Sequence, residues 1–194
     1  MDYKIIDSLK RGGVGLLPAD TIYGISGLAL DKKAVDKIYR LKGRQYSQPF
    51  IVLIADTNQA KKLGLNSKYL EPLEDIWPAP VTLVVPTSNR TPDYLHRGTN
   101  TLAVRVPNDS TLRELINLTG PLVSTSANPQ GSPPAETAGK SREYFGDQLD
   151  FYVNAGQLSG LPSVVIKYDA DGNLVILRHG DPEVENRLPK NVHH

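Results

Sequence analysis

Hydrophobic positions follow two different patterns along this chain. Short apolar runs rich in β-branched residues recur through the sequence, and each has the length of a buried strand. These runs predict strands at 14–17, 50–55, 81–86, 102–106, 122–125, 164–168 and 174–177. Between them, apolar residues repeat every three to four positions, which is typical of helices that bury one face. This second pattern predicts helices at 2–10, 32–42, 67–76, 110–118 and 136–145.

Strands and helices therefore alternate over most of the chain. This order predicts an α/β fold in which helices flank a twisted sheet of mixed parallel and antiparallel strands. No repeat or linker-like segment divides the 194 residues, so we expect one domain over 1–194. The chain ends in two histidines, and we expect 191–194 to be a disordered tail or the remnant of an affinity tag.

The composition is that of a globular protein. Hydrophobic residues make up 39% and charged residues 22%, and the net charge is +1. No apolar run approaches the roughly 18 to 20 residues that a membrane helix needs, so no membrane is involved. The first ten residues are charged and lack a secretory signal, so the expected location is cytoplasmic. The chain has no cysteine, which excludes disulfides, thiolate catalysis and cysteine-bound metals.

Charge is spread unevenly along the sequence. From 31 to 62, eight basic residues stand against three acidic ones, a net charge of +5, whereas 169–185 is acidic. A basic face of this kind fits an anionic ligand such as a triphosphate or RNA. A solvated helix face would give the same pattern, so the charge by itself leaves both readings open.

Common catalytic motifs are absent. The Gly-Lys-Ser tripeptide at 139–141 lacks the upstream glycine of a phosphate-binding loop, because Pro134 stands there. No G-x-S-x-G turn exists, and neither His96 nor His179 has a neighbour at the spacing of metal ligands. We therefore expect no metal-ligating residues in the protein.

Two polar clusters follow predicted elements in the N-terminal half. The first is PADTIYG at 18–24, after the strand 14–17, where Thr21 offers a hydroxyl group and Tyr23 a ring. A turn capped by Asp20, with the tyrosine in the core, would look the same. In the second cluster, the cations Lys42 and Arg44 can converge on a polyphosphate. They would also suit a helix C-terminus.

A third cluster, LVSTSANP at 122–129, carries three hydroxyl groups and an amide within five residues. Strand alternation places Ser124 and Ser126 on one face, and Asn128 follows at the strand end. A row of small hydrogen-bonding groups suits a phosphate, a ribose or a carboxylate.

The fourth cluster consists of two arginines within apolar strands, Arg105 and Arg178, with Ser163 at the start of another strand. A cation is costly to bury without an anion beside it. The partner of each arginine is either a structural carboxylate or an anionic substrate.

Taken together and in this order, the clusters resemble the threonylcarbamoyl-AMP synthase family, the YrdC/TsaC-like family. The matching stretches are GGVGLLPADTIYGISGLA, IYRLKGRQYSQPFIVLI, WPAPVTLVV, TLAVRVP, PLVSTSANPQGSPP, LPSVVI and ILRHGD. They cover nearly the whole chain, from 12 to 181, and several ordered motifs are far more specific than one. The resemblance implies a YrdC-like fold with a concave basic surface, in the short single-domain form.

The resemblance also implies an activity. Family members are nucleotidyltransferases that convert L-threonine, bicarbonate and ATP, with Mg²⁺, into threonylcarbamoyl-AMP and pyrophosphate. The implied partners are tRNA and the downstream threonylcarbamoyl-transferase complex, which passes the group to an adenosine of the tRNA. No covalent enzyme intermediate is expected.

The matching motifs imply roles for individual residues. The implied threonine contacts are Thr21, Arg105, Ser124 and Ser163. The implied ATP contacts are Arg44, Gln48, Thr101, Ser126, Pro134 and Arg178. The implied catalytic residues, near the reacting phosphates, are Lys42, Arg44 and Asn128.

Three positions depart from the family pattern. Ala19 and Val164 stand where threonine is common, and Leu53 stands where longer relatives often carry histidine. These changes bear on the affinity for the amino acid and on the choice between threonine and serine.

Two other functions fit parts of the sequence. A non-catalytic module that binds double-stranded RNA or tRNA would use the +5 segment, but it would not need clustered small hydroxyl groups. A carbamoyl-adenylate-forming domain of hydrogenase maturation proteins belongs to a longer chain with zinc-finger-like cysteines, which are absent here. The synthase is therefore the expected function.

Overall fold

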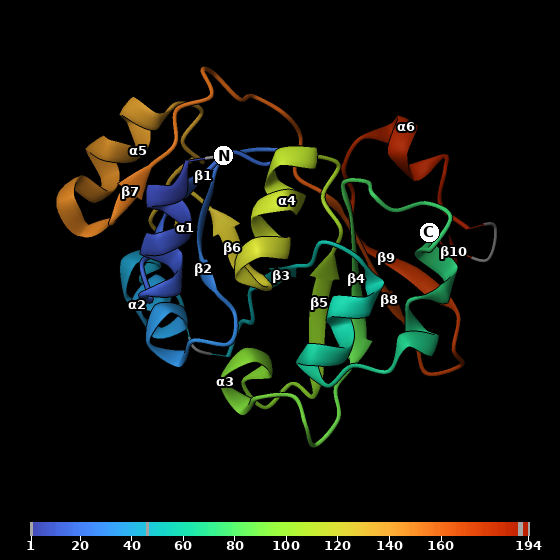
Figure 1. Cartoon of the computed structure of the whole chain (residues 1–194). Helices are drawn as coiled ribbons and strands as arrows, with labels where there is room; N and C mark the ends of the chain where they lie inside the picture. The colour runs from blue at the N-terminus through green and yellow to red at the C-terminus, as the bar shows by residue number, and fades with distance from the viewer. Residues whose placement is uncertain (1, 46, 190–191, 194) are drawn as a thin grey trace.

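Ten strands form one mixed sheet in the residues that the computed structural model describes, 2–45, 47–189 and 192–193 (Figure 1). The strands are β1 (Gly15–Leu17), β2 (Gly24–Leu28), β3 (Ile51–Leu53), β4 (Val81–Pro86), β5 (Thr101–Arg105), β6 (Leu122–Ser126), β7 (Phe151–Tyr152), β8 (Val164–Tyr168), β9 (Leu174–Arg178) and β10 (Val192–His193). Their order across the sheet is β10-β9-β8-β4-β5-β3-β6-β2-β1-β7. Neighbours pair in both parallel and antiparallel directions, so the predicted mixed sheet is confirmed.

Six α-helices and four 3₁₀-helices flank this sheet in the described part of the chain. They are α1 (Tyr3–Lys10), α2 (Lys32–Lys42), α3 (Asp93–His96), α4 (Ser110–Thr119), α5 (Ala138–Phe145) and α6 (Pro182–Glu185), with η1 (Thr57–Leu63), η2 (Ser67–Tyr69), η3 (Glu71–Leu73) and η4 (Gly146–Gln148). None of the described helices is long and apolar enough to cross a membrane. All seven predicted strands are present, with bounds shifted by at most two residues.

Helix α2 has the predicted bounds, and the sequence at each end explains them. The Asp31 side chain accepts hydrogen bonds from the backbone N–H groups of Lys33 and Ala34, as an N-cap does. Gly43 ends the helix with a φ of 61°, a left-handed conformation that glycine adopts without strain. The chain therefore turns sharply between Lys42 and Arg44.

One predicted helix is wrong, and the strands β2, β7 and β10 were not predicted. The helix predicted at 67–76 is replaced by the short η2 and η3, because Pro72 has no N–H to continue a helical ladder. Strand β2 was missed because its sequence, GISGL, contains two glycines and reads as a turn. It forms because β1 and β6 pair with it on both sides.

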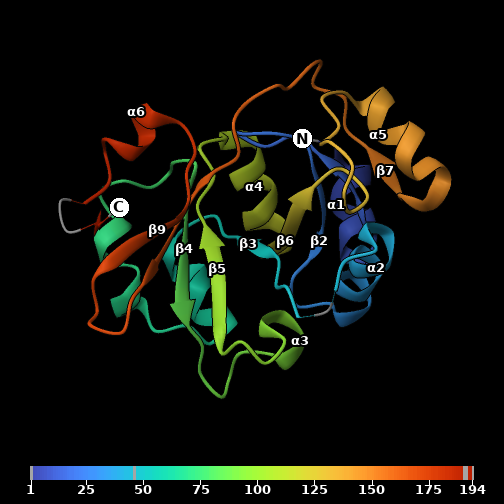
Figure 2. The same ribbon diagram turned by 180° about the vertical axis from the view of Figure 1, so that it is seen from behind.

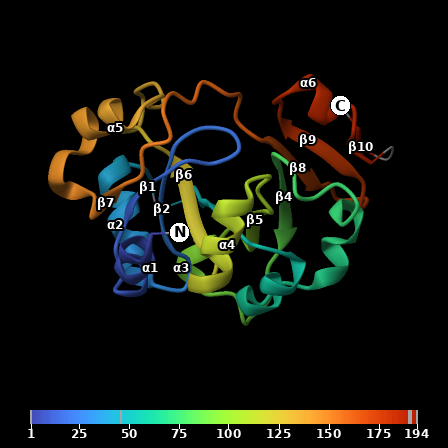
Figure 3. The same ribbon diagram turned by 45° about the horizontal axis from the view of Figure 1, so that its top comes forward.

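Helices cover both faces of the sheet. Helices α1 and α4 pack together over the strand residues Leu17, Leu53 and Leu122. Helix α2 and the η1–η3 segment bury the larger cluster on the other face (Figure 2). Helix α5 and β7 lie at one end of the sheet, and β9, β10 and α6 lie at the other (Figure 3).

The expected C-terminal tail is only partly described. Val192–His193 form β10, which pairs in parallel with β9. Positions 191 and 194 lie outside the described residues.

Strand register places two serines, an isoleucine and an alanine in one row across the centre of the sheet. Ser26 of β2 lies opposite Ser124 of β6, and Ser124 lies opposite Ile51 of β3. Ile51 in turn lies opposite Ala103 of β5. Because side chains alternate along each strand, Arg105 and Ser126 point to the same face as this row. The row forms the floor of a cavity.

Candidate active site

A cavity of about 460 Å³ opens on this face, a volume within the range of small-molecule sites. The β1–β2 loop, β3, β5, β6, the segment before β8 and the end of β9 all contribute to its wall. Eight of the predicted site residues line it: Thr21, Arg44, Arg105, Ser124, Ser126, Pro134, Ser163 and Arg178. Segments far apart in the sequence therefore meet at one site.

Two predicted ATP contacts lie outside the lining of this cavity. Gln48 has an exposed side chain, and its carbonyl oxygen accepts a hydrogen bond from the Tyr39 hydroxyl at 3.0 Å. Thr101 begins β5, and its hydroxyl donates to Thr99 Oγ1 at 3.3 Å. Neither residue is among those that line the cavity.

Lys42 and Asn128 are joined beside the cavity. Lys42 is 4% exposed, and its Nζ donates to Asn128 Oδ1 at 2.9 Å. The same Nζ donates to the carbonyl oxygen of Ser126 at 2.7 Å and to its Oγ at 3.3 Å. A protonated lysine has three donors, so all three are in use. The ammonium group therefore orders the end of β6, and a phosphate would have to replace one of these acceptors.

Arg44 reaches the cavity directly. Its guanidinium carbon lies 5.2 Å from the centre of the Phe50 ring, within the range of a cation–π contact. Its Nε is buried and has no hydrogen-bond partner. This N–H group is therefore available to an anion that enters the cavity.

Arg105 is 5% exposed and is the most deeply buried of the three arginines that line the cavity. Its Nη1 is 3.5 Å from Thr21 Oγ1, and its Nη2 is 3.2 Å from Asp20 Oδ1. Its Nε is buried without a hydrogen-bond partner. Asp20 was not among the predicted site residues, although the cost of burying an arginine did predict a partner of this kind.

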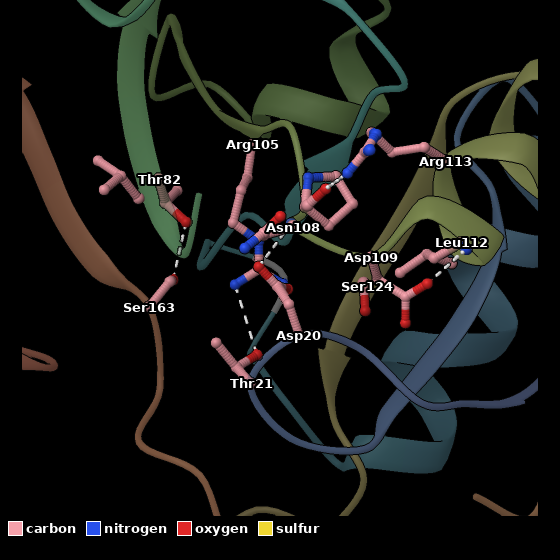
Figure 4. Close-up of polar contacts among 12 residues, drawn as sticks. Asp20, Thr21, Thr82, Arg105, Asn108, Asp109, Leu112, Arg113, Ser124 and Ser163 are labelled. Atoms are coloured by element: carbon pink, nitrogen blue, oxygen red, sulfur yellow. Dashed lines mark hydrogen bonds and ion pairs between the residues drawn. The ribbon is translucent and has the colours of Figure 1, made fainter. Parts of the chain in front are cut away.

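Ser163 is held between Thr82 and Arg178. Its Oγ lies 2.8 Å from Thr82 Oγ1 (Figure 4). The same Oγ accepts a hydrogen bond from Arg178 Nη2 at 3.0 Å. Arg178 also donates to the Ser163 carbonyl oxygen, at 3.1 Å from Nε and 2.8 Å from Nη2. Thr82 was not predicted as a site residue, although its polar side chain in the apolar strand 81–86 was an available signal.

The electrostatic character of the cavity is positive. Among the described residues, no Asp, Glu or His lines it. Burial lowers the pKa of Arg44, Arg105 and Arg178, and the nearby Arg105 and Arg44 lower that of Arg178 further. An anionic ligand would offset this repulsion between cations.

We expect one lysine of the folded protein to lose its proton near pH 8. Burial, with a smaller effect of Arg44, lowers the pKa of Lys42 to about 8. Since the unfolded chain keeps this proton up to about pH 10.4, it holds more protons than the fold between these values. The free energy of unfolding therefore rises with pH through this window on account of Lys42. NMR titration of labelled lysine side chains measures the pKa.

The matched variant for this titration is Lys42→Met, which should lack the resonance that titrates near pH 8. A wild-type protein with no lysine resonance titrating near that pH would contradict the prediction. Above pH 8 the site loses one cation, so affinity for an anionic nucleotide should fall.

The cavity does not fit a resident Mg²⁺ ion. Mg²⁺ prefers carboxylate oxygens and phosphates, and the lining offers no carboxylate. Among the described residues, no group of three or more His, Cys, Asp or Glu side chains could hold a metal. A Mg²⁺ ion that accompanies a nucleotide would be held by the phosphate oxygens, as part of the substrate.

Curated relatives align with most of this chain. The threonylcarbamoyl-AMP synthase of Pseudomonas aeruginosa is 36% identical over 154 residues, which cover 78% of this chain and 83% of the relative. The protein of the same name from Halorhodospira halophila is 37% identical over 156 residues, which cover 79% and 81%.

Solved structures share the fold. The P. abyssi Sua5 protein in complex with L-threonine superposes with a TM-score of 0.84 at 29% identity. The match covers 98% of this chain but only 58% of that longer chain. The Escherichia coli YciO protein has a TM-score of 0.81 at 22% identity, covering 93% of this chain and 90% of that one, and supports the fold alone.

A family model matches nearly the whole chain. The Sua5/YciO/YrdC model, described as telomere recombination, matches residues 7–180. Both the matched length and the identity to the curated relatives assign this chain to the same group. The chain belongs to the Sua5/YciO/YrdC family.

Proposed function

We propose that this chain is a threonylcarbamoyl-AMP synthase, a nucleotidyltransferase that uses L-threonine, bicarbonate and ATP and releases pyrophosphate. The observation that carries the proposal is one cavity in which Arg44, Arg105 and Arg178 meet the hydroxyl groups of Ser124 and Ser126, with no carboxylate in the lining. Relatives 36% and 37% identical over more than three quarters of the chain bear this name.

The amino acid would bind at the deeper end of the cavity. Arg105 is the natural partner of the threonine carboxylate, because a guanidinium group binds a carboxylate in a bidentate manner. The hydroxyl groups of Thr21, Ser124 and Ser163 line the same cavity and would contact the rest of threonine. The related Sua5 protein was solved in complex with L-threonine, which supports threonine as the amino acid.

The nucleotide would use the remaining cations and hydroxyl groups. Arg44 and Arg178 would neutralise its phosphates, and Lys42 would add charge from behind Ser126. Pro134 and Ser126 line the cavity. Gln48 and Thr101 do not line the cavity. We propose that they contact a part of ATP that extends beyond it, or that their side chains turn toward the nucleotide when it binds. ATP would enter with its Mg²⁺ as one substrate.

The reaction then needs positioning and charge neutralisation. The threonine nitrogen attacks the bicarbonate carbon, and loss of water leaves an N-carboxylated threonine. A carboxylate oxygen of this carbamate then forms a bond to the α-phosphorus of ATP. At the same time, the bond between the α-phosphorus and the oxygen that bridges to the β-phosphate breaks. Pyrophosphate leaves with the electron pair of that bond. Negative charge grows on the leaving group, and we expect Arg44 to stabilise it.

The proposed biological role follows from the product. tRNA and the threonylcarbamoyl-transferase complex would consume threonylcarbamoyl-AMP, and we expect the chain to work with them in the cytoplasm. We also propose one domain over 1–194, because a single sheet contains strands from both halves of the chain.

An RNA-binding module without catalysis explains less of the structure. In the +5 segment, Lys32 pairs with Asp36 at 2.5 Å and Lys37 pairs with Asp150 at 2.7 Å. Two cations of the predicted basic face are thus partly neutralised within the protein. RNA binding also gives no reason for the buried Lys42 network.

Pyrophosphate release is the direct test. We expect release only when ATP, bicarbonate and L-threonine are all present, and mass spectrometry should detect threonylcarbamoyl-AMP. Omitting each substrate in turn provides the controls, and L-serine tests the choice of amino acid. Release without threonine, or no release under any of these conditions, would overturn the proposal.

A further inference from the structure

Asp20 is a buried carboxylate that the proposed reaction does not yet use. Its side chain is 5% exposed and does not belong to the cavity lining. Oδ2 accepts a hydrogen bond from the backbone N–H of Asn108 at 2.8 Å (Figure 4). Oδ1 lies 3.2 Å from Nη2 of Arg105. Asp20 therefore ties the β1–β2 loop to the segment after β5 instead of capping its own turn.

The contact with Arg105 is an ion pair without hydrogen-bond geometry. Asp20 Oδ1 has no hydrogen-bond partner, and neither does Arg105 Nε. The remaining contact of the guanidinium group, to Thr21 Oγ1 at 3.5 Å, is long. Arg105 is thus held electrostatically from one side, while donors on the group stay unsatisfied beside a cavity.

The other cations of the cavity explain why such a counter-charge is needed. Arg44 and Arg178 share the cavity with Arg105, and no carboxylate lines it. Repulsion between the three guanidinium groups favours conformations that move them apart. An anion fixed behind Arg105 opposes that displacement, and the hydrogen bond from Asn108 keeps this anion in place.

We infer that Asp20 is a positioning residue for amino-acid binding: its carboxylate holds the Arg105 guanidinium group so that its free N–H groups face the carboxylate of the incoming amino acid. The inference rests on the proposed function for the identity of that amino acid. It assigns Asp20 no contact with the substrate. Its effect should therefore appear in the affinity for threonine, through Arg105, and not in the affinity for ATP.

Asp20→Asn is the variant that separates charge from shape. The carboxamide keeps the volume and one oxygen that can accept the Asn108 N–H, but it removes the negative charge. The matched control is Asp36→Asn, because Asp36 also pairs with an arginine, Arg97, at 2.7 Å. Asp36 lies outside the cavity lining.

Steady-state pyrophosphate release at varied threonine and varied ATP measures the effect. For Asp20→Asn we expect the KM for threonine to rise at least about 10-fold, the loss of roughly 1.4 kcal/mol of binding. The KM for ATP should stay within about two-fold of wild type. Asp36→Asn should change neither value. Asp20→Glu, which keeps the charge, should recover threonine affinity relative to Asp20→Asn.

A ligand without a carboxylate provides the second readout. NMR titration gives the dissociation constants of L-threonine and of L-threoninamide for wild type and Asp20→Asn. The substitution should weaken threonine binding and leave threoninamide binding unchanged, because only the first ligand uses Arg105 through its carboxylate. Melting temperatures show whether each variant is folded at the temperature of the titration.

Three outcomes would overturn the inference: an unchanged threonine affinity in Asp20→Asn, an equal loss for threoninamide, or a parallel rise in the KM for ATP. Failure of the proposed function looks different, since wild-type protein would then release no threonine-dependent pyrophosphate. Calorimetric binding of other amino acids with a free carboxylate, to wild type and Asp20→Asn, would still decide the role of Asp20 in that case.

Discussion

Replacing Arg44 by alanine is expected to lower kcat/KM for ATP by about 10³-fold, because an arginine that stabilises the leaving phosphates contributes effects of this size. Its Nε is buried without a hydrogen-bond partner, and its guanidinium group lies over the Phe50 ring at the wall of the cavity. The side chain is thus placed to bind a ligand. Pyrophosphate release at varied ATP measures the loss.

Two further substitutions sharpen this experiment. Arg40→Ala is the matched control, since Arg40 is exposed, lies in the last turn of α2 and is absent from the cavity lining. It should leave kcat/KM within about two-fold of wild type. Arg44→Lys keeps the charge but loses the planar fork, and we expect an intermediate value. Equal activity of Arg44→Ala and Arg40→Ala would remove Arg44 from the site.

Replacing Arg105 by methionine is expected to destabilise the protein by about 3 to 5 kcal/mol, because it leaves the buried Asp20 carboxylate without its counter-charge. The same variant should bind threonine much more weakly, with a dissociation constant raised by more than about 100-fold. Urea denaturation measures the first effect, and NMR titration with threonine measures the second at low temperature, where the variant stays folded.

The double variant Arg105→Met with Asp20→Asn distinguishes the two effects. It removes both charges of the pair, so most of the lost stability should return. Threonine binding should not return, because the guanidinium group is still missing. A double variant as unstable as Arg105→Met would show that the unpaired carboxylate is not the cause of the instability.

Local sequence was sufficient for the elements whose signals agree with one another. Asp31, the apolar stripe and Gly43 all define the same helix, and α2 has the predicted bounds. Local sequence was misleading where pairing with neighbouring strands decides whether a segment becomes a strand. The glycines of β2 argue against a strand, yet β1 and β6 supply hydrogen-bonding partners on both sides. The segment 67–76 has a helical apolar pattern that Pro72 interrupts.

The same division holds at the site. Ser124 and Ser126 were predicted from one strand, because alternation places both on one face, and both line the cavity. Thr82 and Asp20 were missed, because each contacts a residue far from it in the sequence, Ser163 and Arg105 respectively. Gln48 and Thr101 were predicted from the family motif, and their side chains lie outside the present cavity lining.

The sequence by itself determined seven of the ten described strands and four of the six described α-helices. It also determined the lack of thiol chemistry, the row of hydroxyl groups and the family resemblance. The tertiary structure alone decided which polar groups meet. Lys42 and Asn128 are 86 residues apart, and Thr21 and Arg105 are 84 apart. Local patterns depend on neighbours along the chain, whereas these contacts depend on the order and register of strands, which only the packed sheet establishes.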